Sequence, residues 1–284
     1  MENMKILICT DGSKISKNAI SFGGLVAKGL DAEIVLLHVV ENKKKDRSSE
    51  ILEEGKNILK EHNLKVKTKI RRGTPELKII NEANKGYSLV VLGSHGINSI
   101  KIFLFGDVAY RVVQCVEIPV LIVRKKRKKL KKILVCCGGS KYAKEAIRFG
   151  AMLARVMKAK TTLLHVIPEM PQMFRGLGMN ETIEKFLKTN TPEARILKDA
   201  AKLFEKEGLK TQVELRHGFP PEEILNQAEQ GNYDLILMGS HGMFGVRRLL
   251  MGAVAYKVVQ HSIVPCLLVK PKKFKFLSSI NAYK

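Results

Sequence analysis

The sequence has few of the features that mark secreted, membrane-spanning or disulfide-stabilised proteins. It holds five cysteines, an odd number, and none forms a CxxC pair, so we expect reduced, buried thiols rather than a disulfide framework or a metal site. No apolar run approaches the ~20 residues that a membrane-spanning helix needs. Charged residues interrupt the start of the chain, where a signal peptide would be apolar. We therefore expect a cytoplasmic protein without a transmembrane segment.

Familiar catalytic and metal-binding patterns are also missing. The sequence shows no HExxH pair, no paired acidic site, no Ser-His-Asp spacing and no Cys/His zinc cluster. No arginine- and aromatic-rich RNA-binding motif is visible either. We therefore name no catalytic residue and no metal ligand, and we favour a binding protein over an enzyme.

What the chain has in excess is positive charge. Its 50 Lys and Arg outnumber 27 Asp and Glu, which gives a net charge of +23. This excess favours anionic partners without choosing among nucleotides, nucleic acids and membrane surfaces. The densest basic run spans residues 124–132, and two interpretations stay open for it: a solvated linker or a polyanion-binding patch.

The two halves of the chain repeat each other. Residues 6–14 match residues 133–141, and residues 93–96 match residues 239–242. The offset between the copies grows from 127 to 146 residues, so the second copy has a longer connection, placed at 168–192. That connection is either a lid or partner surface or, over 181–188, a helix that covers the domain. We predict domain 1 at 1–124, a basic linker at 125–132, domain 2 at 133–270 and a tail at 271–284.

Within each copy, short apolar runs alternate with helical patterns. In the first copy we predict strands at 5–10, 33–39, 66–70, 89–92 and 120–123, with helices at 16–29, 49–62, 75–84 and 105–115. Such alternation predicts βαβ units, a parallel sheet and helices on both faces. Ligands of such sheets bind beyond the carboxyl ends of the strands, which directs attention to the loops at 10–14 and 93–106.

The loop after the fourth predicted strand has the spacing of a phosphate-binding turn. Gly93-x-x-Gly96 is followed by nine residues and then Gly106, and Gly239, Gly242 and Gly252 repeat that spacing. Glycines allow close approach of the backbone to a ligand, and the last one opens a helix whose free N–H groups attract anions. His95 and His241 lie inside the turns, where they face solvent or contact a phosphate. We expect His38 and His165 to have packing or supporting roles.

These motifs resemble those of the universal stress proteins, in a tandem two-domain form. In the first copy the matching segments are Thr10-Asp11-Gly12-Ser13, Leu37-His38-Val39, Gly73-Thr74-Pro75, the glycine motif with Val108-Ala109, and Pro119-Val120. In the second copy they are Leu164-His165-Val166, Gly218-Phe219-Pro220 and the second glycine motif. The resemblance covers nearly the whole chain. It implies an α/β fold of two doubly wound, parallel five-stranded sheets of order 3-2-1-4-5 (adenine nucleotide alpha hydrolase-like), paired through residues 121–123 and 267–269.

The resemblance also implies an adenine-nucleotide site in the first domain, with ATP or AMP as ligand. The matching residues there are Asp11, Val39, Gly93, Gly96, Gly106 and Asp107. Asp107 stands where nucleotide-binding members carry Ser or Thr beside the phosphates, so triphosphate binding calls for a bridging ion such as Mg²⁺. The second site is degenerate, with Gly138, Val166, Gly239, Gly242, Gly252 and Ala253 at the matching positions. There Gly138 replaces the Asp and Ala253 replaces the Ser or Thr.

Three functions stay open on the sequence alone. The leading one is a binding and regulatory module of the stress response, gated by nucleotide, whose protein partner the sequence does not name. The second is an ATP hydrolase or nucleotide transferase on the same fold. The third is a nucleic-acid or anionic-surface binder that uses the basic run at 124–132. Assembly beyond the internal domain pair, into a homo-oligomer, also stays open.

Overall fold

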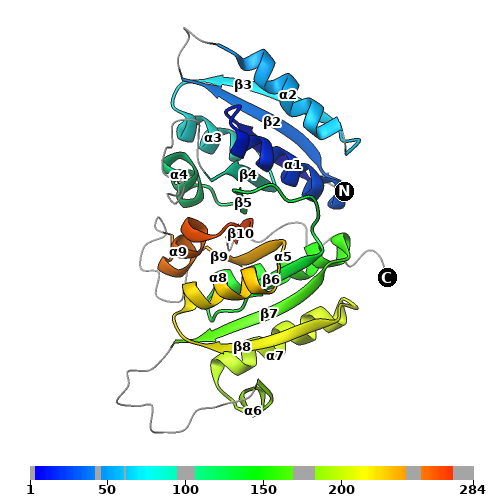
Figure 1. The fold of residues 1–284 in the computed structure, drawn as a ribbon, viewed down its shortest axis with the longest axis vertical. Coiled ribbons are helices and arrows are strands. Elements are labelled where there is room, and N and C mark those ends of the chain that lie inside the picture. The colour runs from blue at the N-terminus through cyan, green and yellow to red at the C-terminus, as the bar shows by residue number, and fades with distance from the viewer. Residues whose placement is uncertain are drawn as a thin grey trace.

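The first domain alternates strands and helices in the predicted order (Figure 1). The structure is a computed structural model that describes residues 4–41, 46–60, 62–94, 106–168, 183–240 and 251–270. The elements of the first domain are β1 Lys5–Thr10, α1 Lys14–Gly29, β2 Glu33–Val40, α2 Ser48–Lys60, β3 Val66–Arg72, α3 Pro75–Ala83, β4 Leu89–Gly93, α4 Asp107–Cys115 and β5 Val120–Val123. The continuous apolar runs predicted as strands are confirmed, because each lies in the sheet.

The second domain repeats this order and adds one helix. Its elements are β6 Lys132–Cys136, α5 Lys141–Met157, β7 Lys160–Ile167, α6 Ile183–Lys188, α7 Pro192–Lys206, β8 Thr211–His217, α8 Pro220–Gln230, β9 Leu235–Gly239, α9 Ala253–His261 and β10 Cys266–Val269. The added helix α6 lies in the long connection, where a covering helix was one of the two interpretations. The predicted tail at 271–284 lies outside the described residues.

The strands form one ten-stranded sheet of order β3-β2-β1-β4-β5-β10-β9-β6-β7-β8 (Figure 1). Each half has the predicted 3-2-1-4-5 order, and the strand pairs within each half are parallel. The halves join where β10 runs antiparallel to β5, with Leu267 opposite Leu121. The predicted pairing of the last strands is therefore confirmed. It makes the two five-stranded sheets continuous, because each covers the edge that the other would expose.

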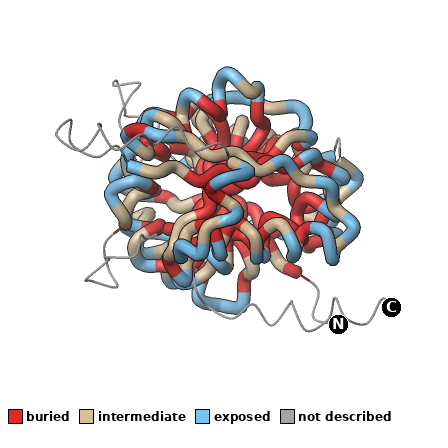
Figure 2. Tube along the Cα trace, turned by 90° about the horizontal axis from the view of Figure 1, so that it is seen from below, coloured by how far each residue is buried: buried red, intermediate tan, exposed pale blue. Residues whose placement is uncertain are grey.

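Helices cover both faces of the sheet and enclose two apolar layers. Neighbouring strand residues alternate between these layers, so Ile6 and Ile8 face one and Leu7 and Cys9 face the other. The first layer packs against α1, α2, α5 and α7, and the second against α3, α4, α8 and α9. Figure 2 shows this buried centre surrounded by a partly exposed shell. Each layer extends through both domains, so the junction belongs to the core. None of the described helices is long and apolar enough to cross a membrane.

Two cations, one from each domain, link the junction strands to a helix of the other domain. Arg124 follows β5 and donates from Nη2 to the carbonyl oxygen of Gln260, in α9, at 2.9 Å. Lys270 follows β10 and donates from Nζ to the carbonyl oxygen of Gln114, in α4, at 3.3 Å. Burial lowers the pKa of both side chains, that of Lys270 to about 8. Each cation lies at the carboxyl end of a helix, where the helix dipole favours positive charge.

Leu267→Ala should destabilise the whole protein, because Leu267 is 1% exposed and lies in the junction opposite Leu121. We expect the free energy of unfolding to fall by about 2–5 kcal/mol, measured by urea denaturation. Leu77→Ala is the matched control, since Leu77 is 56% exposed, and its effect should stay within about 0.5 kcal/mol. Equal effects from the two variants would contradict a formed junction.

Candidate functional site

The candidate site lies where the strand order of the first domain reverses. There β1 pairs with β2 on one side and with β4 on the other, so the loops after these strands leave the sheet at the same edge. Thr10 at the end of β1 lies in register with His38 of β2. The topology therefore brings Asp11, Val39 and Gly93 to one edge, as the sequence predicted.

The loop after β1 is held by its own side chains. The backbone N–H of Ser13 donates to Oδ1 of Asp11 at 3.0 Å, and Gly12 has a φ of +82° that favours glycine. Ser13 in turn caps α1, because its Oγ accepts from the N–H of Ser16 at 3.1 Å. Asp11 is half-buried. The loop thus fixes the one carboxylate that the sequence assigned to nucleoside recognition.

The same loop of the second domain keeps the cap but loses the carboxylate. Ser140 caps α5 by accepting from the N–H of Ala143 at 3.1 Å, while Gly138 stands at the position of Asp11. A Cβ on Gly138 would meet only the Cβ of Ala143, at 3.7 Å, which is ordinary contact. Packing therefore leaves room for a Cβ at Gly138.

Backbone hydrogen bonds close both ends of the glycine-motif loop. The N–H of Ser94 donates to the carbonyl oxygen of Val123, and the N–H of Gly106 donates at 2.8 Å to that of Ser94. In the second domain, Ser240 and Gly252 make the same contacts, the second at 2.9 Å. The repeated geometry brings the start of α4 beside the end of β4, and likewise α9 beside β9. Gly96, Gly242, His95 and His241 lie outside the described residues.

Packing accounts for the first glycine of each motif. A Cβ on Gly93 would lie 3.0 Å from Cγ2 of Ile15 and 3.3 Å from the backbone nitrogen of Ser16. A Cβ on Gly239 would lie 2.7 Å from the backbone nitrogen of Ala143. These glycines let the fourth strand of each domain approach the helix that follows the first strand. They position the site through packing. From the sequence alone, this role could not be distinguished from close approach of the backbone to a ligand.

Two short helices open at the candidate phosphate positions without a side-chain cap. Gly106 precedes α4 and Gly252 precedes α9, and neither helix start has a side-chain cap hydrogen bond. Asp107 is exposed at the first position of α4, and Ala253 is exposed at that of α9. An acid in the first turn stabilises a helix by interacting with the positive end of its dipole. Asp107 therefore occupies with its own charge the end of α4 that would attract an anion.

The histidines at the ends of the second strands are buried and have structural contacts. Nδ1 of His38 hydrogen-bonds the carbonyl oxygen of Thr10 at 2.8 Å, and Nδ1 of His165 hydrogen-bonds that of Cys137 at 2.6 Å. Each ties its strand to the loop that bears the site, as a supporting role requires. The ring of His165 also stacks on Phe186 of α6, with centroids 6.1 Å apart. Val39 and Val166, which follow the histidines, are half-buried.

The cysteines are free, and four of the five are buried. Burial raises the pKa of Cys137 and Cys266 to about 12 and raises that of Cys9 and Cys136 as well, so these thiols stay protonated. Cys115 differs from the expectation, because it is exposed at the last position of α4. Among the described residues, no group of three or more His, Cys, Asp or Glu could hold a metal ion.

Comparison with known proteins identifies this arrangement. The sequence profile of the universal stress protein family matches residues 2–124 and again residues 129–270. The chain belongs to the universal stress protein family. A universal stress protein of Methanocaldococcus jannaschii is 36% identical over 156 residues, which cover 54% of this chain and 89% of that protein. One of Synechocystis is 22% identical over 276 residues, which cover 93% of this chain and 88% of that protein.

The fold of the whole chain also has solved counterparts. The crystal structure of a universal stress protein from Archaeoglobus fulgidus is similar, with a TM-score of 0.72 at 22% identity. The similarity covers 94% of this chain and 96% of that chain. Both universal stress protein domains and their order are therefore those of a known fold.

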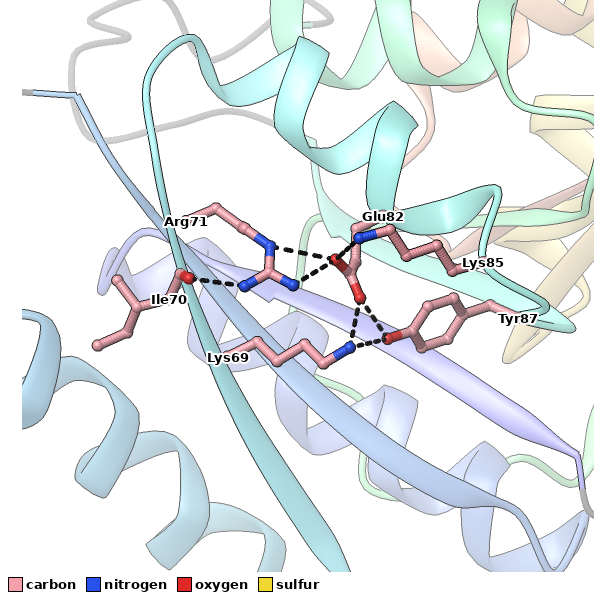
Figure 3. Close-up of polar contacts among 6 residues, drawn as sticks. All are labelled: Lys69, Ile70, Arg71, Glu82, Lys85 and Tyr87. Carbon is pink, nitrogen blue, oxygen red and sulfur yellow. Dashed lines mark hydrogen bonds and ion pairs between the residues drawn. The ribbon is translucent and has the colours of Figure 1, made fainter.

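A buried charged cluster in the first universal stress protein domain escaped the sequence analysis (Figure 3). Glu82 of α3 is 1% exposed, and four side chains donate to its carboxylate: Lys69 at 2.6 Å, Tyr87 at 2.9 Å, Arg71 at 2.9 Å and Lys85 at 3.3 Å. Burial alone would raise the pKa of Glu82, but these hydrogen bonds lower it to about 2. The cluster ties α3 to the edge strand β3. The sequence feature that could have indicated this cluster is Glu82 itself, a charged residue three positions after Ile79 and therefore on the core-facing side of the helix.

The second domain builds the same contact from different residues. Gln227 of α8 takes the place of Glu82, accepting from Arg216 and donating to Glu214, both of β8. Arg216 also pairs with Glu223 at 3.0 Å. The cluster thus joins a helix to an edge strand in both domains, while its charges are redistributed. We assign it a structural role rather than a catalytic one.

Glu82→Gln should remove a pH-dependent part of the stability. Because the pKa of Glu82 is depressed, its contribution is present above the unfolded-state pKa of ~4.3 and is lost as pH falls towards 2. We expect the variant to lose on the order of 3 kcal/mol of unfolding free energy at neutral pH. Its stability should also change less than that of the unmodified protein between about pH 5 and pH 2.

Urea denaturation at several pH values measures both effects. Glu53→Gln is the control, since its side chain is 59% exposed and pairs only with Lys56 among the described residues. Parallel acid profiles for Glu82→Gln and the unmodified protein would show that Glu82 is not held ionised in the fold.

Proposed function

We propose that the chain is a binding and regulatory universal stress protein whose first domain takes an adenine nucleotide, ATP or AMP, and whose second domain is degenerate. The observation that carries the proposal is the placement of Asp11, half-buried and fixed by Ser13, at the edge where Ser94 and Gly106 close the glycine-motif loop. The resemblance of the motifs to those of the family implies an Asp at this position in nucleotide-binding members. The cytoplasmic location stays a prediction.

The differences between the domains support an unequal pair of sites. Gly138 forfeits the charged hydrogen bond that Asp11 would make, worth roughly 1.5–3 kcal/mol. The helix start after the last glycine does not separate the two domains in this way, because Asp107 and Ala253 both lack the hydroxyl of a Ser or Thr. In addition, Phe186 of the second domain packs on His165, the residue before Val166 in β7. The carboxylate missing at Gly138 therefore favours the first domain by roughly ten- to 150-fold.

Asp107 determines which nucleotide the first domain prefers. A phosphate about 4 Å from this carboxylate is repelled by about 1 kcal/mol in water and about 4 kcal/mol at an effective dielectric of ~20. Because Asp107 is exposed, the penalty falls towards the lower value. We infer a preference for AMP over ATP unless Mg²⁺ bridges the carboxylate and the phosphates. The enzyme alternative, an ATP hydrolase or nucleotide transferase, has no described contact in its favour.

Asp11→Ala should weaken AMP binding by about 1.5–3 kcal/mol, roughly ten- to 150-fold, as measured by isothermal titration calorimetry. Asp11→Asn is a second variant that keeps the oxygen accepting from Ser13 and removes only the charge. Asp199→Ala is the control, because it removes the same charge at an exposed position of α7, and it should leave AMP binding unchanged. The reciprocal variant, Gly138→Asp with Ala253→Ser, should add a second site, since a Cβ at Gly138 makes only ordinary contact. Unchanged affinity in both Asp11 variants would reject the site.

Asp107→Ser should tighten ATP binding by about 1–4 kcal/mol and change AMP binding less, because fewer phosphate charges lie near the start of α4. Calorimetric titration with each nucleotide, with and without Mg²⁺, measures the effect, and AMP is the internal control. An unchanged ATP affinity would mean that the phosphates do not lie at α4. ADP released in the Mg²⁺ samples would favour the enzyme alternative.

A further inference from the structure

The segment between the domains concentrates positive charge on an ordered stretch of chain. Residues 124–132 contain eight basic residues, Leu130 and no acid. Five of its side chains are exposed lysines: Lys125, Lys126, Lys128, Lys129 and Lys131. We call these five lysines the cationic ridge. Figure 1 shows the segment as the coil that joins β5 to β6 across the domain junction.

The backbone beneath the cationic ridge is anchored at both ends. At its start, the side-chain amide of Asn18 in α1 donates to the carbonyl oxygen of Arg124 at 3.1 Å. At its end, Oδ2 of Asp234 accepts from the backbone N–H of Lys131 at 2.8 Å and of Lys132 at 3.1 Å. Leu130, between them, is 1% exposed and belongs to the core. A merely solvated linker needs none of these anchors.

The charges of the cationic ridge are not neutralised within the described parts of the chain. The ion pairs seen there join other residues, mostly on helices and edge strands. Asp234 is the acid that contacts this segment, and it is buried. It accepts from the backbone N–H groups of Lys131 and Lys132 rather than from an ammonium of the cationic ridge. Holding five like charges on a short fixed segment is unfavourable in the free protein, and an external polyanion would relieve it.

We propose that the cationic ridge binds the phosphate backbone of double-stranded DNA without reading its sequence. The seven residues from Lys125 to Lys131 extend over at most about 23 Å, and a duplex carries one negative charge per ~1.7 Å of its axis. A duplex of that length carries about a dozen phosphates in all, and those on its near side face five lysines whose backbone is already fixed. Each phosphate contact releases condensed counterions, which is the driving force of sequence-independent binding.

The surroundings of the cationic ridge favour a duplex over other polyanions. Single-stranded nucleic acids are bound mainly by stacking on aromatic side chains. Amphipathic membrane-surface segments add inserted apolar residues to their basic ones. The exposed large apolar residues of the described chain are Ile70, Leu77, Val156, Phe219 and Val254. None of them lies in the linker. A duplex needs only the phosphate contacts that lysines supply.

The test measures binding to a labelled DNA duplex of about 20 base pairs, roughly two helical turns, by fluorescence anisotropy. Salt is varied between about 50 and 200 mM. The ridge variant changes Lys125, Lys126, Lys128 and Lys129 to Ser. The control variant changes four exposed lysines of the second domain to Ser, namely Lys188, Lys202, Lys206 and Lys210, which removes the same net charge. Circular dichroism confirms that both variants fold.

The ridge variant should bind at least about tenfold more weakly, and the slope of log K against log salt should fall in magnitude by about 3.6, or 0.9 for each lysine. The control variant should keep most of the affinity and slope. Equal losses in the two variants would show that binding follows net charge and would overturn the proposal. So would tighter binding to the single strand, binding confined to vesicles of phosphatidylserine and phosphatidylcholine, or no duplex binding at low salt.

Discussion

The antiparallel pairing of β5 with β10 determines how every other part of the molecule is placed. Each strand is the last of its domain, and each would otherwise present unpaired N–H and C=O groups at the edge of a sheet. Because strands within a domain are parallel and the junction is antiparallel, the carboxyl edges of the two domains lie on opposite edges of the ten-stranded sheet. The two candidate nucleotide sites therefore belong to different edges of that sheet. What the domains share is the core and the clamp made by Arg124 and Lys270.

The junction also connects the site of the first domain to the second domain. Arg124 donates from Nε to Oγ of Ser94 at 3.3 Å and from Nη2 to α9 of the second domain. Ser94 in turn accepts from Gly106 at the start of α4. Lys270 holds the other end of α4, at Gln114, so both ends of this helix depend on groups at the domain interface. A ligand that changed the glycine-motif loop would act on contacts that hold the domains together.

How much of this the sequence predicts depends on whether a feature is local or requires packing. The spacing of apolar residues predicts the strands, the helices and the repeat. It also predicts that β5 and β10 pair, because both are apolar runs that would otherwise lie exposed at the edge of a sheet. The reason for Gly93 is different, since Ile15 and Ser16 approach it only once α1 has folded onto β4. Glu82 likewise looks like a solvated helix charge until Lys69 and Arg71, on a strand more than ten residues earlier, surround it. The glycine-motif residues Gly96 and Gly242 lie outside the described chain, so their roles stay predictions.

The linker shows the same limit most clearly, because its composition alone favours a solvated chain. Its order comes from contacts that no local pattern encodes: the burial of Leu130 in a core shared by both domains, and a carboxylate from Asp234 a hundred residues later. The carboxylate of Asp234 accepts from the backbone N–H groups of Lys131 and Lys132 and pairs with no ammonium of the cationic ridge among the described contacts. The linker leaves β5 at its carboxyl end and enters β6 at its amino end, so it runs along the edge that bears Asp11 and Gly106. The first domain thus has its candidate nucleotide site and its densest positive charge on one edge, whereas the site of the second domain, without its Asp, lies on the other.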